Sequence, residues 1–372
     1  TGHVDDAEKP TCQFYAPDAE LRDYNAQDCE ILYRAIEGFQ EHILSIGGEM
    51  AKTAAGTAMR LFRRRFLTRE IGMPDAINRI AREAYTASRV EVFERRAPRG
   101  AATYDINSSF PSSMRRPMPA ALGRETKKPK PEELWIGDAT VNVPACHIPP
   151  LPVRLKGRVY FPVGTWRGWY TSADLEFLEE CGGSYKLHEA HVFEPFEDLG
   201  AYAETCYAER KRTGDEGESY RWKLLGNSLY GKFSEQTEKE ALRFDPPSTL
   251  CDHDPPHAPG DCRRELTPGF WIFRDERSIA HEIVPIGAFI TADARRTLGR
   301  FLIQAGRPFY CDTDSIFTLA KLPTSDALGG LKLEKTWAEC EFLAPKVYGG
   351  TLDGCPHKPK CDGPCDLSLI HI

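Results

Sequence analysis

The sequence predicts an α+β fold, and three observations support this. Helical and strand patterns are segregated along the 372 residues rather than alternating regularly. Two helical patterns, near residues 200–212 and 219–233, are joined by a short glycine-containing linker, which predicts a helical hairpin. Short apolar alternations bounded by turn residues predict strands that pair locally, and no internal repeat is apparent.

The N-terminal half should begin with a long amphipathic helix from Asp18 to about Ile46, because apolar residues recur at helical spacing up to two glycines. A second helix is expected over residues 53–67. Strands are expected at residues 90–93 and 103–106, which places Asp105 at a strand end. Pro111 suits the N1 position of the helix that follows.

The rest of the chain continues this pattern. Residues 134–196 should form short strands with one helix near residues 172–181. After the helical hairpin, residues 246–268 read as a loop rich in Pro, Asp and His. A helix over residues 288–304 and a β-hairpin centred on residues 312–314 should follow.

Composition limits the class of protein. The chain is 41% hydrophobic and 28% charged, which is typical of a globular protein, and its net charge of −7 argues against nonspecific coating of nucleic acid. No apolar stretch approaches the roughly 20 residues of a membrane span, and no signal peptide is visible. Its twelve cysteines form no repeating framework, so we expect a reduced, cytosolic setting.

Three aspartates have the pattern of a metal site. Asp312 and Asp314 are two residues apart in a predicted hairpin, so their side chains share one face. With Asp105 from another strand they could hold Mg²⁺, which prefers carboxylate oxygens, water and substrate phosphates. An Asp-x-Asp pair by itself is more typical of a solvated turn.

A second pattern lies on the predicted helix near residues 219–233. Lys223, Asn227, Tyr230 and Gly231 fall at positions i, i+4, i+7 and i+8, so they form a single stripe. An ammonium, an amide, a ring and a glycine suit a nucleotide-contacting face, although a plain surface helix would also fit.

Three strings resemble motifs A, B and C of family B DNA polymerases, in the family's order: DINSSFP at 105–111, KLLGNSLYG at 223–231 and YCDTDS at 310–315. Motifs B and C match the family pattern, whereas motif A has Ser109 and Phe110 where the family usually has Leu and Tyr. The resemblance implies a palm with an antiparallel sheet, helical-hairpin fingers and the C-terminal portion of an RNase H-like 3′–5′ exonuclease domain. It also implies transfer of deoxynucleotides to a primer 3′-hydroxyl with two Mg²⁺ ions, for which Mn²⁺ could substitute.

The resemblance implies a role for each motif residue. Asp105 and Asp314 would be the main metal ligands, with Asp312 as an auxiliary. The nucleotide contacts would come from Lys223 on the triphosphate, Asn227, Tyr230 and Gly231 at the nascent base pair, Phe110 against the sugar, and Ser109, which loosens local packing.

Further motifs extend the resemblance. Tyr24 and Asp28 resemble the third exonuclease motif, but the two earlier motifs are absent, so this chain should not proofread. Thr291 and Arg295 resemble a DNA-backbone motif, and Lys346 and Tyr348 a motif that steadies the primer. Residues 85–88 occupy the place of a Tyr-x-Gly-Gly motif but lack both glycines.

Short spacing between the motifs resembles the protein-primed branch found in phages, linear plasmids and adenovirus-type replicons. The expected divisions are the end of the exonuclease domain over residues 1–50, a helical connection 51–84, palm 85–151, a terminal-protein type insertion 152–198, fingers 199–234, a second insertion 235–283 and palm 284–366. Residues 367–372 look like a non-native tail. The chain also starts without Met, so we expect a fragment that lacks a thumb.

Two questions stay open at this stage. Cys251, His253, His257 and Cys262 could bind Zn²⁺, although their short spacing suits the tip of a loop better. The alternatives to a protein-primed enzyme are a nucleic-acid-primed family B polymerase, a reverse transcriptase or RNA polymerase, and an inactive DNA-binding relative. Possible partners are primer-template DNA, deoxynucleoside triphosphates and a terminal protein.

Overall fold

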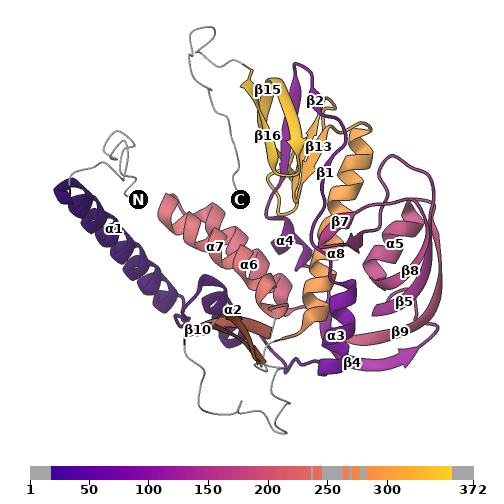
Figure 1. Ribbon diagram of the computed structural model, residues 1–372, viewed down its shortest axis with the longest axis horizontal. Helices are drawn as coiled ribbons and strands as arrows, with labels where there is room; N and C mark the ends of the chain where they lie inside the picture. Colours follow the sequence, from indigo (N-terminus) through magenta and orange to yellow (C-terminus); the bar gives the residue numbers. More distant parts are fainter. Residues whose placement is uncertain (1–17, 236–237, 245–262, 268–269, 277–281, 354–372) are drawn as a thin grey trace.

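The computed structural model describes residues 18–235, 238–244, 263–267, 270–276 and 282–353 (Figure 1). The cysteine and histidine group at 251–262 and the tail at 367–372 lie outside them. The helices are α1 (Asp18–Ser45), α2 (Ala54–Arg65), α3 (Asp75–Ala84), α4 (Ser109–Ser113), α5 (Ser172–Glu180), α6 (Asp198–Arg212), α7 (Glu216–Phe233) and α8 (Val284–Ala305). None of the helices in these described ranges is long and apolar enough to cross a membrane.

The largest sheet is antiparallel and contains the strands expected near residues 105 and 312. Its order is β1 (Val90–Val92), β13 (Tyr310–Asp312), β14 (Ser315–Thr318), β3 (Ala101–Ile106), β15 (Leu331–Ala344) and β16 (Val347–Leu352), with β2 (Arg96–Ala97) on β15. Alternate residues of β3 and β14 enter different apolar clusters. Ile106 and Ile316 pack with Leu298 of α8, whereas Phe317 packs with Phe342. Apolar clusters therefore lie on both faces of this sheet, and one of them joins it to α8.

A second antiparallel sheet lies beside the first. Its order is β4 (Met118–Thr126), β9 (Ser184–Phe196), β5 (Leu134–Val143) and β8 (Gly164–Thr171), and α5 packs on it. A small hairpin, β6 (Val153–Leu155) with β7 (Arg158–Tyr160), is inserted between β5 and β8. The second sheet extends along the chain from Met118 to Phe196, so the insertion boundary expected at residue 152 falls inside it. The cause is the pairing of β4 with β9, which links residues 118–126 to residues 190–196.

The helical hairpin is confirmed. Helices α6 and α7 pack together, and the Tyr202 hydroxyl donates a hydrogen bond to the Leu225 carbonyl at 2.9 Å. Asp215 caps α7 by accepting from the Glu218 N–H, and Phe62 of α2 meets Phe233 edge to face. Figure 1 shows α1 as a long helix beside this hairpin.

Three local expectations were wrong or incomplete. Helix α4 begins at Ser109, so Pro111 is its third residue rather than its first, a position that still needs no N–H partner. The helical connection expected over residues 51–84 contains a second, separate short helix, α3, besides α2. Strand β11 (Arg263–Thr267) occupies a portion of the expected loop. It belongs to a separate three-stranded sheet, in the order β10 (Glu238–Phe244), β12 (Phe270–Glu276) and β11.

Candidate active site

Strand pairing brings the first and third motifs together. In the register of β3 and β14, Asp105 lies opposite Ser315, the residue after Asp314. The Ile106 N–H also donates to the Asp314 carbonyl at 2.8 Å. The structure therefore juxtaposes Asp105 and Asp314, although 209 positions separate them in the chain.

The two carboxyl groups are electrostatically frustrated. Burial, reinforced by the charges of Asp314 and Glu334, raises the pKa of Asp105 to about 7. Burial, reinforced by Asp312, raises the pKa of Asp314 to about 6. Two carboxyl groups that resist ionisation together are well suited to a divalent cation, which would neutralise both.

Asp312 is engaged elsewhere. Its carboxylate pairs with Lys346 Nζ at 2.5 Å and accepts a hydrogen bond from the Tyr310 hydroxyl at 3.1 Å and from Thr313 Oγ1 at 3.0 Å. Among the described residues, no three His, Cys, Asp or Glu side chains converge as a metal cage. The structure thus brings the pair Asp105 and Asp314 together, with Asp312 set apart on Lys346.

Backbone strain concentrates around these side chains. Four non-glycine residues of the described chain have a positive φ, and three of them belong here: Ser108 at 51°, Thr313 at 59° and Lys346 at 65°. Such conformations are uncommon for residues with a Cβ, and they recur where function requires a particular side-chain direction. The loops that present these carboxylates are therefore shaped at a conformational cost.

Helix α7 presents the second motif as predicted. Its buried face consists of Trp222, Leu225, Gly226, Leu229 and Phe233. Lys223, Asn227 and Gly231 are exposed on the other side. Tyr230 is half-buried because its ring stacks on Phe110 of α4, with centroids 4.2 Å apart. Lys223 is close enough to Asp105 to oppose the rise in its pKa. The Phe110–Tyr230 stack and the nearness of Lys223 to Asp105 therefore place motif B beside motifs A and C.

Arg210 is a site residue that the sequence reasoning missed. It lies in the last turn of α6, and its Nη1 donates to Ser108 Oγ at 3.3 Å in the motif A loop. A cation there adds to Lys223 and to Lys332, which pairs opposite Asp105 on β15. The available signal was the run Arg210–Lys211–Arg212 at the end of the predicted hairpin helix.

Arg89 holds the tip of the hairpin that contains Asp312 and Asp314. Its backbone carbonyl accepts from the Thr313 N–H at 2.9 Å. Its guanidinium is buried, lies 4.1 Å from the ring centroid of Phe161, and donates to the Pro149 carbonyl at 2.9 Å. Residues 149 and 161 belong to the segment between β5 and β8, so Arg89 links that segment to the candidate site.

Thr291 and Arg295, the residues expected to contact the DNA backbone, are both buried in this structure. The Arg295 guanidinium pairs with Asp174 of α5 at 2.8 Å and also bonds the Thr86 carbonyl. Its charge is therefore used inside the protein, where it joins α8, α5 and the segment 85–88.

The remaining motif residues have a mixed environment. Tyr348 packs among Tyr310, Phe317 and Phe342. Tyr24 and Asp28 lie one turn apart on α1, where Tyr24 is half-buried and Asp28 is exposed. Their exonuclease role stays a prediction. The Ser109 hydroxyl is buried and has no hydrogen-bond partner among the described residues.

Comparisons with known proteins agree with this arrangement. The protein-family model described as DNA polymerase type B, organellar and viral, matches residues 8–248 of this chain. A probable DNA polymerase of Ascobolus immersus is 29% identical over 92% of this chain and 30% of its own length. The DNA-directed DNA polymerase of Enterobacteria phage PRD1 is 26% identical over 89% of this chain and 59% of its own length.

The fold is that of a solved phage polymerase. Phi29 DNA polymerase complexed with single-stranded DNA superposes with a TM-score of 0.69 at 21% identity, covering 94% of this chain and 62% of that one. Its ternary complex with primer-template DNA and incoming nucleotide gives the same TM-score at 19% identity over 95% and 65%. The chain spans roughly a third to three fifths of the two curated relatives named above. Because the family model covers more than half of its residues, the chain belongs to the organellar and viral type B DNA polymerases.

Proposed function

We propose that this protein is a DNA-directed DNA polymerase that adds deoxynucleotides to a primer 3′-hydroxyl. The observation that carries the proposal is the convergence of motifs A, B and C. Asp105 pairs beside Asp314 in the sheet, and Phe110 stacks on Tyr230 of α7. A site that unites paired carboxylates, an exposed lysine and a flat ring suits nucleotidyl transfer.

Each side chain has a chemical task under this proposal. Asp105 and Asp314 would hold Mg²⁺ or Mn²⁺, which supply charge stabilisation to the attacking and leaving oxygens. Lys223 and Arg210 would neutralise triphosphate oxygens, because Lys223 is exposed near Asp105 and the half-buried Arg210 reaches the motif A loop. Phe110 would lie against the sugar, and Tyr230, Asn227 and Gly231 would bound the nascent base pair.

Primer-template DNA is the proposed partner. Solved complexes of phi29 DNA polymerase contain primer-template DNA and incoming nucleotide, and that protein shares this fold. Lys346 would steady the primer from its place on Asp312, so one ion pair would link the primer contact to the catalytic hairpin. The six cysteines in the described ranges are unpaired, which supports the proposed cytosolic location.

Protein priming is a finer proposal. It is supported by the match to the organellar and viral family and by the large unit at residues 118–196 inserted between motifs A and B. A terminal protein would dock on that unit. Transfer of a labelled deoxynucleotide onto a hydroxyl of a co-expressed protein, without an oligonucleotide primer, would support this; strict dependence on an oligonucleotide would favour the nucleic-acid-primed alternative.

The central test is primer extension by the protein expressed from its whole reading frame, with deoxynucleotides and Mg²⁺. We expect Asp105→Asn and Asp314→Asn to remove extension, and Asp75→Asn, at an exposed aspartate of α3 outside the motifs, to retain it. DNA binding that survives in a wild-type protein with no Mg²⁺-dependent extension would instead identify an inactive DNA-binding relative. Extension by Asp314→Asn at the wild-type rate would refute the site assignment.

A further inference from the structure

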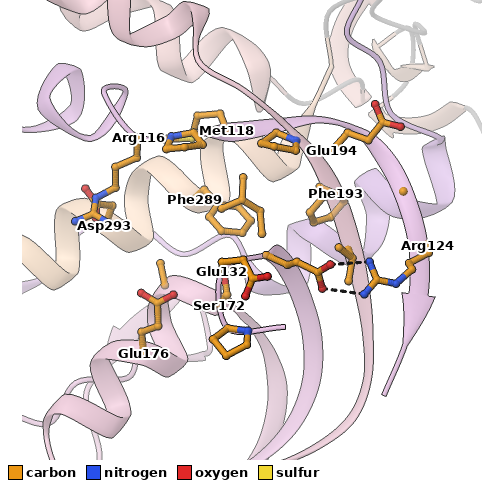
Figure 2. Close-up of a pocket in the computed structure, with 18 of the residues that line it drawn as sticks. Arg116, Met118, Arg124, Glu132, Ser172, Glu176, Phe193, Glu194, Phe289 and Asp293 are labelled. Atoms are coloured by element: carbon orange, nitrogen blue, oxygen red, sulfur yellow. Dashed lines mark hydrogen bonds and ion pairs between the residues drawn. The ribbon is translucent and has the colours of Figure 1, made fainter. Parts of the chain in front are cut away.

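A cavity of about 590 Å³ lies between the second sheet and α8, away from the motif residues (Figure 2). Met118, Phe193 and Phe289 are among its apolar lining residues, and the segment between β4 and β5 forms one side. Cavities of about 300–1,000 Å³ that are mainly apolar, with a few polar groups, are typical small-ligand sites and often lie between structural units.

One wall of the cavity is fixed by a chain of ion pairs. Asp293 of α8 bonds Arg116 at 2.8 Å and Arg296 at 2.6 Å, and Arg296 reaches Glu176 of α5 at 2.6 Å. Arg296 is only 3% exposed, and its Nε is buried without a partner among the described residues. This wall exists before any ligand arrives, which lowers the ordering cost of binding.

The opposite side of the cavity is formed by residues 131–133, which hydrogen bonds to Glu133 hold in place. Arg124 and Glu133 form two parallel hydrogen bonds at 2.9 and 2.8 Å, and the Lys130 N–H donates to Glu133 at 2.8 Å. These bonds, that from Arg124 first, lower the pKa of Glu133 to about 2. The same bonds hold Glu133 and the Lys130 backbone, and the neighbouring Glu132, which is exposed to solvent, lies among the cavity residues below Phe289 in Figure 2.

The charges of the lining do not balance. Five carboxylates and three guanidinium groups line the cavity: Asp293, Glu132, Glu133, Glu176, Glu194, Arg116, Arg124 and Arg296. Glu194 is paired with Arg69 at 2.7 Å, and the ion pairs above account for the rest except Glu132. Within the described stretches of the chain, the Glu132 carboxylate has no ion pair or hydrogen bond. An occupant with an apolar body and a positive charge complements this cavity.

We propose that the cavity binds an aromatic cation, with its ring against the Phe193 and Phe289 pair and its ammonium at Glu132. Phe193 and Phe289 meet edge to face with centroids 6.4 Å apart, and both line the cavity, so a third ring can pack beside this pair. A free arylalkylamine and an adjacent aromatic and basic residue of a protein share this chemistry. The inference stands independently of polymerase activity.

The cavity is connected to the candidate active site through the chain that follows α4. Arg116 and Met118 line the cavity and follow α4, the helix that contains Phe110. An occupant would therefore contact the chain only six residues beyond the ring that stacks on Tyr230.

The test titrates the protein with 1-naphthylmethylamine by calorimetry and compares 1-naphthoate, which has the same ring and the opposite charge. We expect saturable binding of the amine with about a tenfold preference over the carboxylate. Glu132→Gln should reduce amine affinity about fivefold and leave naphthoate binding no weaker. Glu339→Gln, an exposed glutamate on the distant β15, is the matched control and should change neither.

A second variant tests the location through volume rather than charge. Ala173→Leu adds carbon atoms to the cavity wall from α5, and it should weaken both ligands if they occupy this space. Thermal unfolding confirms that each variant is folded. A blocked Phe-Lys dipeptide amide distinguishes the sources: competition with the amine indicates a protein side-chain pair, and its absence a free amine. Equal affinity for the two naphthyl compounds, or binding that neither Glu132→Gln nor Ala173→Leu changes, overturns the proposal.

Discussion

The ring of Phe110 lies stacked on the ring of Tyr230, with centroids 4.2 Å apart and planes inclined by 24°. Phe110 comes from α4, after the strand that contains Asp105, and Tyr230 comes from the motif B stripe of α7. The contact therefore joins the sheet to the helical hairpin at the place where a sugar and a base would lie under the proposed function.

The first prediction follows from this stack. Phe110→Ala should remove the flat surface against the sugar and increase incorporation of ribonucleotides relative to deoxynucleotides about 10- to 100-fold. Phe110→Tyr retains the ring and should keep the wild-type ratio. The measurement is kcat/KM for matched ribo- and deoxynucleotides, and an unchanged ratio in Phe110→Ala would contradict the assigned role.

The second prediction concerns pH and the paired carboxylates. Because the folded-state pKa of Asp105 is raised from 3.8 to about 7, the folded protein binds more protons than the unfolded chain between these values. Stability without divalent cations should then fall as pH rises from about 4 to 7. At pH 7.5 Asp105→Asn should stabilise the cation-free protein, by on the order of 1 kcal/mol after solvent screening. Denaturant unfolding in EDTA measures this, and Mg²⁺ should stabilise the wild type more than the variant.

A third prediction addresses Arg295. Removing one partner of a buried ion pair leaves a charge without compensation, so Arg295→Ala should cost about 3–5 kcal/mol of unfolding free energy. Arg300→Ala offers a control on the same helix, because its pair with Glu180 is exposed and worth about 1 kcal/mol or less. If Arg295 instead contacted DNA phosphates, its loss would reduce the salt dependence of DNA binding with little effect on stability.

The fourth prediction tests the link through Arg89. A double-mutant cycle with Arg89→Met and Phe161→Leu should give a coupling of about 1 kcal/mol in unfolding free energy, as expected for a buried cation over a ring. Phe161→Leu should also lower kcat for extension, because Arg89 supports the Thr313 turn. Coupling in stability without any effect on kcat would limit Arg89 to a structural role.

Much of this architecture could be predicted from local pattern. The periodicity of residues 18 to about 46 and 219–233 predicted α1 and α7, and the pattern around residues 312–314 predicted the hairpin formed by β13 and β14. Burial was harder to predict. Thr291 and Arg295 look like surface residues in a sequence window, and only the packing of α5 against α8 reveals that Asp174 neutralises Arg295.

Long-range pairing explains the other differences. The second sheet starts at Met118 because β4 pairs with β9, some 70 residues away, and no local signal marks that partner. Arg210 reaches Ser108 only because α6 folds back towards the motif A loop. The Glu132 carboxylate, likewise, could not be distinguished from other surface glutamates until its neighbours were known.

The position of β3 between β14 and β15 has a consequence for how the protein matures. Its partners lie more than 200 residues later in the chain, so Asp105 cannot meet Asp314 until nearly all of the described sequence has been synthesised. Closing so long a loop is slow compared with forming local helices. We expect helices α6 and α7 to form early and the nucleotide site to be completed last, so a ribosome-bound intermediate would be partly folded yet unable to bind a metal–nucleotide complex.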